Sequence, residues 1–215
     1  GIYPTFGDIT GDNIDDLILG NDSGYVAVYR NIATSNAAQA NFIFQTDSLA
    51  GIDVGNYSFP VIYDYNQDGK TDLILGNEIG QIVLYQDSSS SSTKNLKLVS
   101  AQLGGIKVGS AFTFLGYSAP FIGYLDSTYE TSLVIGTADG TLEIYDSIDQ
   151  NYNSIPRTDS FYTSIQTAFR AVPTIADLDN NGSLDMIIGS QNGGVQLYSM
   201  KTITSINFIN LSIRL

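Results

Sequence analysis

Cysteine, histidine and tryptophan are absent from this 215-residue sequence, and basic residues are scarce. Without cysteine there are no disulfides, thiolate metal sites or cysteine nucleophiles. Without histidine the commonest general base and the commonest transition-metal ligand are missing. Nine Lys and Arg residues stand against 22 Asp and Glu residues, which gives a formal net charge of −13. This balance argues against nucleic acid as a partner, because clustered basic residues hold a phosphate backbone.

Long apolar runs are missing as well, since no segment approaches the roughly 20 residues of a membrane-spanning helix. We therefore expect a protein that does not span a membrane. The sequence shows neither an initiator methionine nor a signal peptide, which we interpret as a processed product or a part of a larger polypeptide or assembly. Only 14% of the residues are charged, and Ser, Thr, Asn and Gln replace them on the expected surface. This composition favours an extracellular or cell-surface location for a secreted protein.

What the sequence does contain is a fourfold internal repeat. Each copy begins at a proline, reaches a glycine 16 residues later at the end of an apolar run, and reaches a tyrosine 25 residues after the proline. The prolines are Pro4, Pro60, Pro120 and Pro173, the glycines are Gly20, Gly76, Gly136 and Gly189, and the tyrosines are Tyr29, Tyr85, Tyr145 and Tyr198. The constant register indicates four copies of one structural unit.

Each copy has the pattern of about four β-strands. A short apolar run ends at the glycine, a second glycine four residues later signals a tight turn, and alternation of apolar and polar residues follows. Repeats of four strands with a spacing of 53 to 60 residues are typical of β-propeller blades. We therefore predict an all-β protein that forms part or all of a single propeller. The predicted four-stranded blades are approximately residues 1–51, 52–108, 109–168 and 169–215.

An acidic loop separates the first two predicted strands in three of the copies. Counted from its first Asp, side-chain oxygens fall at positions one, three, five and nine, and position seven offers a backbone carbonyl. The predicted metal ligands are Asp8, Thr10, Asp12, Ile14 and Asp16 in the first copy, Asp64, Asn66, Asp68, Lys70 and Asp72 in the second, and Asp177, Asp179, Asn181, Ser183 and Asp185 in the fourth. Alternating oxygens of this kind converge on one hard cation, and Gly or Asn at position six permits the sharp bend.

The ligand chemistry points to calcium. Ligands that are all oxygen favour Ca²⁺ over zinc or copper, and Mg²⁺ demands stricter geometry, so we predict about three Ca²⁺ sites. Carboxylates this close repel each other unless a cation lies between them, and the ions are therefore expected to stabilise the fold. The third copy has Tyr124, Asp126, Thr128 and Ser132 at the ligand positions, with a single carboxylate. We predict that it binds no ion and that Tyr124 packs into the place of the first ligand.

The pattern Pro-x-x-x-Asp-x-(Asp/Asn/Thr)-x-(Asp/Asn)-Gly-x-x-Asp-(Leu/Met)-Ile-(Leu/Ile)-Gly resembles the FG-GAP or VCBS repeat family over essentially the whole chain. The first copy departs from the pattern at Asn13. The resemblance implies a β-propeller, as in the integrin α-subunit head, with calcium in the blade loops. The links Gly-Ile-Asp-Val-Gly at 51–55 and Gly-Tyr-Ser-Ala-Pro at 116–120 are similar to those of large Bacteroidetes surface proteins exported by the type IX secretion system.

The biochemical role is open to three interpretations. The chain is a non-catalytic module for adhesion or for binding a protein or glycan, a polysaccharide-active enzyme such as a lyase, or a structural spacer. We favour the first, because an enzyme without histidine would need Tyr, Lys, Asp, Glu or Arg as its base, and most carboxylates belong to the acidic loops. Six extra residues precede the third copy, and we predict that Phe112 and Phe114, with Tyr117, border a recognition surface.

Overall fold

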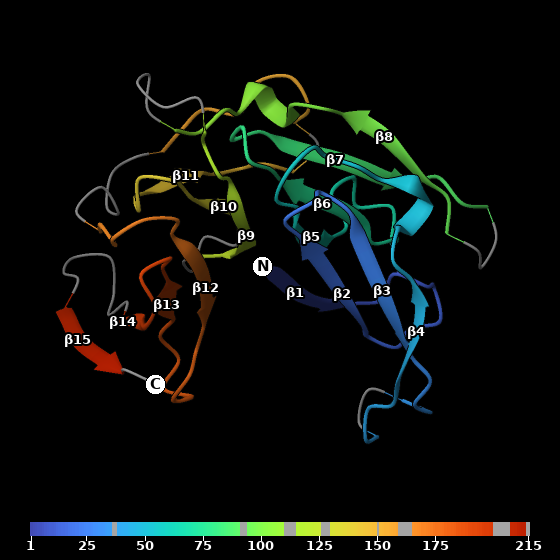
Figure 1. The fold of residues 1–215 in the computed structure, drawn as a ribbon, viewed down its shortest axis with the longest axis horizontal. Helices are drawn as coiled ribbons and strands as arrows, with labels where there is room; N and C mark the ends of the chain where they lie inside the picture. The colour runs from blue at the N-terminus through green and yellow to red at the C-terminus, as the bar shows by residue number, and fades with distance from the viewer. Residues whose placement is uncertain are drawn as a thin grey trace.

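The computed structural model describes residues 1–35, 38–90, 94–109, 115–125, 130–149, 151–158 and 165–199, and the backbone of 207–213. Its regular structure is almost entirely β (Figure 1). The helical segments within these ranges are two single 3₁₀ turns, Leu49–Gly51 and Leu103–Gly105. The predicted all-β class is confirmed. Neither turn, nor any other helix in the described ranges, has the length and apolar character needed to cross a bilayer.

The strands form four antiparallel sheets of consecutive strands. The first sheet contains β1 (Ile2–Gly7), β2 (Asp16–Asn21), β3 (Val26–Asn31) and β4 (Phe42–Thr46). The second contains β5 (Phe59–Tyr63), β6 (Asp72–Gly76), β7 (Ile82–Asp87) and β8 (Leu96–Ser100). The third contains β9 (Ala119–Tyr124), β10 (Thr131–Gly136) and β11 (Leu142–Tyr145), and the fourth contains β12 (Val172–Ala176), β13 (Asp185–Gly189), β14 (Val195–Ser199) and β15 (Asn207–Ile213).

Three of the sheets have the four strands that the repeat predicts, whereas the third has three strands among the described residues. An isolated bridge joins Tyr145 to Arg157 in the third sheet. In the first two sheets, the tyrosine at the same repeat position pairs with Phe44 of β4 or Leu98 of β8. Arg157 therefore occupies the place that the outermost strand fills in the first and second sheets.

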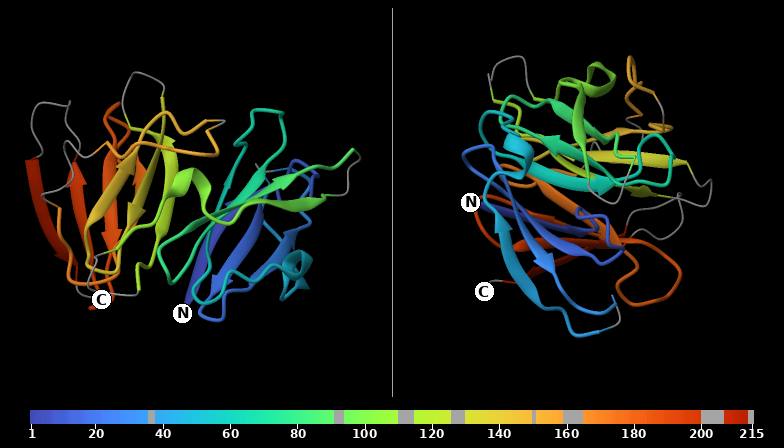
Figure 2. Two further views of the ribbon diagram at one scale, coloured as in Figure 1. Left: turned by 90° about the horizontal axis from the view of Figure 1, so that it is seen from above. Right: turned by 90° about the vertical axis from the view of Figure 1, so that its right-hand side faces the viewer.

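The four sheets form an arc around a common centre (Figure 1). Their first strands, β1, β5, β9 and β12, lie side by side near that centre in chain order. The first and fourth sheets are the two ends of the arc, as the left view of Figure 2 shows. The two middle sheets are covered on both sides, so β6 and β10 are buried along their whole length. Such strands require continuous apolar runs rather than alternation.

The same two sheet faces meet at every junction between consecutive sheets. We call the face that carries the residue directly after the Asp or Ser at position nine the front face, and the opposite one the back face. Front-face residues on the second strands are Leu17, Leu73, Leu133 and Met186, and back-face residues are Ile18, Ile74, Val134 and Ile187. In each of the three cores, the back face of one sheet packs against the front face of the next.

Antiparallel topology places the connections at two opposite ends of the sheets. The loops between first and second strands, which include the acidic loops, all leave from one end. The links that enter the first strands, and the turns between second and third strands, lie at the other end. The three predicted metal loops are thus brought to one side of the arc, and Tyr117 lies on the opposite side.

Candidate metal centre

The first Asp of each acidic loop folds the loop around its own carboxylate. In the first loop, the N–H groups of Asp12 and Asn13 donate to Asp8, at 3.1 and 2.8 Å. The residues at the same positions in the other loops make the same bonds to Asp64 and Asp177, at 3.1 and 2.8 Å in both. The three loops therefore share one backbone conformation, although only their first and last residues, both Asp, are the same in all three.

Left-handed backbone at positions four and six produces the tight bends of this conformation. At position six, Asn13, Gly69 and Gly182 have φ of 63°, 83° and 83°. At position four, Gly11, Gln67 and Asn180 have φ of 83°, 60° and 57°. The sequence predicted the bend at position six, including its tolerance of asparagine. It did not reveal the second bend, because glutamine at position four is not a residue typical of left-handed backbone.

The Asp at position nine is buried at the start of the second strand. Asp16 and Asp72 are fully buried, and Asp185 is nearly so. One carboxylate oxygen of Asp72 accepts the N–H of Tyr65 at 3.1 Å, and the other accepts the N–H of Asp87 at 2.9 Å. Asp16 makes the same two bonds, to Ile9 and Asn31. Asp16 and Asp72 thus join their loops to the end of the third strand, and Asp185 accepts the N–H of Leu178 in its own loop at 3.2 Å.

Carboxylates lie close together in the fourth and second loops, and their proximity has an electrostatic cost. In the fourth sheet, carboxylate oxygens of Asp177, Asp179 and Asp185 lie within 4.8 Å of one another. In the second sheet, burial raises the pKa of Asp72, and backbone N–H donors oppose that rise. The neighbouring carboxylates of Asp68 and Asp64 raise its pKa further. A cation bound among these groups would remove the repulsion.

Basic side chains partly neutralise the first two loops. The guanidinium of Arg30 forms an ion pair with Asp12 at 2.8 Å, and Lys70 lies 3.6 Å from Asp68. Both pairs are at least partly exposed, so each contributes little to stability. In the fourth loop, position seven is Ser183 rather than lysine. Within the part of the chain that the structure describes, the fourth loop is also the one whose three acidic side chains each place an oxygen within 4.8 Å of the others.

Thr10 provides an independent test of whether the first loop fits a metal. Its buried hydroxyl oxygen makes no well-formed hydrogen bond among the described residues, and its weak interaction with the carboxylate of Asp12 helps to lower the pKa of that group. A buried hydroxyl so poorly paired lowers stability. Thr10 stands at position three, where the sequence predicts a metal ligand. The predicted ligands of the first loop are all oxygens and include this poorly paired hydroxyl, so the loop fits a hard cation.

The third sheet has lost this arrangement. Ser132 occupies position nine, is buried, and donates to a carboxylate oxygen of Asp146 at 2.6 Å. Tyr124, at position one, is 54% exposed. The expectation that Tyr124 packs into the place of the first ligand is therefore wrong. Asp126 and Thr128 lie outside the described residues.

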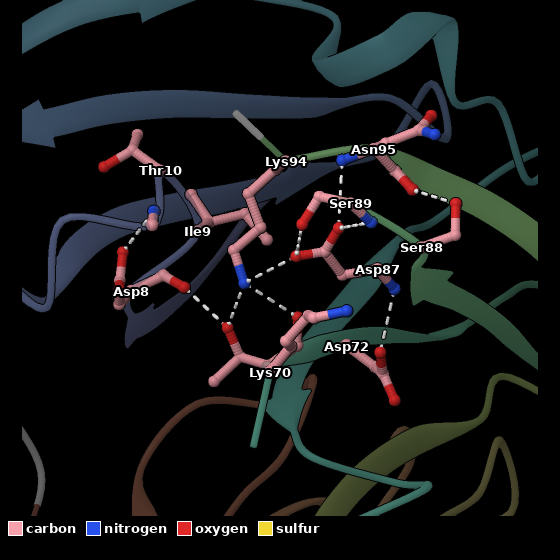
Figure 3. Close-up of polar contacts among 12 residues, drawn as sticks. Asp8, Ile9, Thr10, Lys70, Asp72, Asp87, Ser88, Ser89, Lys94 and Asn95 are labelled. Carbon is pink, nitrogen blue, oxygen red and sulfur yellow. Dashed lines mark hydrogen bonds and ion pairs between the residues drawn. The ribbon is translucent and has the colours of Figure 1, made fainter. Parts of the chain in front are cut away.

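A lysine links the first and second acidic loops (Figure 3). The ammonium of Lys94 donates to the backbone carbonyl and hydroxyl of Thr71, at 3.0 and 2.6 Å, and lies 3.4 Å from a carboxylate oxygen of Asp87. The Thr71 hydroxyl in turn donates to the carbonyl of Asp8 at 2.6 Å. These residues border a cleft of about 410 Å³ between the two loops. The two loops are therefore held together as one surface.

The predicted recognition surface is described only in part. Phe112 and Phe114 lie outside the described residues. Tyr117 is 5% exposed, and its ring packs against that of Tyr57, with centroids 4.8 Å apart. The structure thus places Tyr117 inside an aromatic cluster, with little of its ring available to a ligand.

Arg170 completes this cluster and was missed in the sequence. Its guanidinium lies over the Tyr117 ring, 3.9 Å from the centroid, and over the Tyr57 ring at 4.9 Å. All three residues have positive φ, at 53°, 48° and 58° for Arg170, Tyr117 and Tyr57. Each precedes a repeat proline by three residues, which is the signal that could have identified Arg170. The cation–π stacking of Arg170 on the two tyrosine rings therefore joins the segments that enter the second, third and fourth sheets.

Two comparisons with known proteins gave no match. No protein-family model matches the chain, and no curated protein is significantly similar to it.

Proposed function

We propose that this chain is a calcium-stabilised, non-catalytic β-propeller module of a secreted or cell-surface protein, which binds a protein or glycan. The observation that carries the proposal is the shared fold of the three acidic loops. Each loop curls around its first Asp and buries its last Asp. Alternating oxygen ligands, with a backbone carbonyl at position seven, match what Ca²⁺ requires from a short loop.

The arrangement of the sheets supports a propeller. Four sheets are placed side by side around one centre, with their first strands innermost (Figure 1). Each packs face to face with the next through an apolar core. Radial packing of this kind leaves only short sheet edges exposed, which is the advantage of propeller blades. We accordingly propose that each sheet is one blade.

Three of the tyrosines are poorly suited to act as the base of a lyase. A lyase without histidine would rely on a residue such as tyrosine as its base. Burial raises the pKa of Tyr63 to about 12, and burial also raises the pKa of Tyr65 and of Tyr117. A tyrosine with so high a pKa is almost fully protonated at neutral pH and is a poor general base. The proposed ligand, a protein or glycan, depends on Phe112 and Phe114 and stays a prediction.

The calcium sites are tested by counting ions in matched variants. We expect Asp72→Asn and Asp185→Asn each to lose one bound Ca²⁺, because position nine contributes a ligand in the second and fourth loops. Asparagine keeps one oxygen acceptor, so in Asp72→Asn one of the two buried backbone N–H groups stays paired and the other loses its partner. The variants should therefore fold with reduced stability. Ser132→Ala should leave the count unchanged. Calorimetric titration gives the stoichiometries, and an unchanged count in both Asn variants would contradict the proposed sites.

Thr10→Val should lower stability in calcium but not in chelator. In chelator, valine removes a buried hydroxyl whose one interaction, with Asp12, is weak, so the free energy of unfolding should stay the same or rise slightly. In saturating calcium, loss of a ligand should make the variant less stable than the wild type. The control is Thr137→Val, since Thr137 is buried and hydrogen-bonded to Thr141 at 2.9 Å. It should lose stability equally in both conditions, and the same pattern in Thr10→Val would remove Thr10 from the site.

A further inference from the structure

No other part of the chain that the structure describes covers the back face of the fourth sheet. The first residue of the third strand is a back-face residue in every sheet, and it is 0% exposed at Val26, 0% at Ile82 and 2% at Leu142. Its counterpart in the fourth sheet, Val195, is 39% exposed. Leu178, at position two of the fourth loop, is also exposed, whereas the equivalent Ile9 and Tyr65 are buried against the following sheet. This face has the residues of a junction without the sheet that covers them.

The front face of the first sheet is uncovered in the complementary way. Ile2 and Phe6 are 68% and 60% exposed. Leu17 on the neighbouring strand is partly exposed, although Leu73 and Leu133 at the same position are fully buried. The proline that begins each repeat is likewise exposed in the first sheet, where it is Pro4, and buried in the other three sheets. An apolar front face is thus presented to solvent at one end of the arc and an apolar back face at the other.

Glycine at the end of the second strand shows that the back face of the fourth sheet is shaped for a neighbour. A Cβ added at Gly20, Gly76 or Gly136 would meet a backbone carbonyl of the next sheet's entering link at 1.9, 1.8 or 2.0 Å. The carbonyls belong to Ser58, Ser118 and Ala171. At Gly189 the nearest atom is 4.0 Å away, from its own sheet. Gly189 therefore keeps the close-approach surface of the other three, and no described atom of another sheet lies within 4 Å of its added Cβ.

Backbone hydrogen bonds fix the geometry of each junction in the same way. The N–H of Ser58 donates to the carbonyl of Asn21 at 3.0 Å, and the N–H of Ser118 donates to Asn77 at 3.1 Å. The N–H of Ala171 donates to Thr137 at 3.1 Å. Each donor stands two residues before a repeat proline, and each acceptor directly follows the glycine that ends a second strand. The equivalent donor in the first sheet is the N–H of Ile2, and the equivalent acceptor in the fourth sheet is the carbonyl of Ser190.

We propose that a second copy of this chain covers these faces, with the front face of its first sheet packed on the back face of the fourth sheet. The proposed interface continues the junction already present three times, since back face meets front face and the link at Ile2 approaches Gly189. No charged pairing is required, because both faces are apolar at their centres. The contact is head-to-tail, so each copy retains one free face of each kind until a ring closes or the assembly grows.

Substitutions on the two faces test the proposal in the full chain. The front-face variant is Ile2→Lys with Phe6→Lys, and the back-face variant is Val172→Lys with Val195→Lys, at exposed positions that leave the sheet cores intact. Gly189→Ala is a third variant, whose added methyl would clash only across the junction. The control, Ile79→Lys with Leu98→Lys, makes the same charge change at residues 44% and 55% exposed on neither free face.

Sedimentation velocity over roughly micromolar to millimolar concentrations, in calcium, measures the association. We expect the wild type and the control to associate as concentration rises, and each of the three face variants to remain monomeric with an unchanged melting temperature. Mixing the front-face and back-face variants should give a 1:1 heterodimer that grows no further, since one intact junction remains. A monomeric wild type, association of Gly189→Ala, loss of association in the control, or self-association of either lysine face variant would overturn the proposal.

Discussion

Gly76→Ala is expected to destabilise the protein severely. A Cβ at this position would lie 1.8 Å from the carbonyl oxygen of Ser118 and 2.8 Å from Cδ of Pro120. Both atoms belong to the entering segment of the third sheet, which hydrogen bonds fix against Asn77, so no flexible side chain can rotate away. The second and third sheets would have to separate, and Ile74 and Leu133 would lose part of their burial. We expect a loss of about 4 kcal/mol or more in the free energy of unfolding.

The matched control for this prediction is Gly189→Ala, at the same repeat position in the fourth sheet. Its added Cβ meets nothing closer than 4.0 Å, and its backbone is not left-handed. Alanine there should leave the stability of the monomer unchanged or raise it by about 0.5 kcal/mol. Urea denaturation of the two variants measures both effects. Equal stabilities would show that close approach between the sheets does not determine the fold.

Removing calcium is expected to lower the melting temperature by roughly 20 °C. Each site saturated at 100 times its dissociation constant stabilises the native state by about 2.7 kcal/mol, so three sites contribute about 8 kcal/mol. For a chain of this size each kcal/mol shifts the midpoint by about 2–4 °C. Empty loops also leave Asp64, Asp68 and Asp72 repelling one another, as the raised pKa of Asp72 indicates.

Thermal scans in chelator, in calcium and in magnesium measure this effect. Calcium should give the highest midpoint, and magnesium a smaller rise, because Mg²⁺ demands near-octahedral geometry and retains water. Superimposable scans in chelator and calcium would contradict a structural role for the metal. A larger rise of the midpoint in magnesium than in calcium would identify Mg²⁺ as the preferred ion, still bound in the acidic loops.

Much of the fold was predictable because the repeat constrains it. The run from Asp72 to Gly76 is apolar at every position between its ends, and the structure buries this strand on both faces. The acidic loops were predictable for a similar reason, since oxygen side chains at alternate positions leave few alternatives to a tight turn. The structure confirms the left-handed bend at Asn13 that this pattern required.

Contacts between repeats were not predictable from the sequence. Nothing in the repeat distinguishes Val195 from Val26, yet one is exposed and the other buried, because only Val26 has a sheet following it. Arg170 was missed because its role depends on the rings of Tyr57 and Tyr117, more than fifty residues away in sequence. The expectation for Tyr124 failed because a large aromatic side chain was assumed to be buried, whereas it is exposed at the end of β9.

The measurement that tests the central claim most directly is native mass spectrometry of the intact chain titrated with calcium after exhaustive chelation. Three loops share one fold and place oxygen ligands at the same positions, and the third repeat has Tyr124 and Ser132 at two of these positions. We therefore predict saturation at three Ca²⁺ ions per chain. A chain that binds no calcium would contradict the proposed function, and a chain that binds four would contradict the assignment of the third repeat.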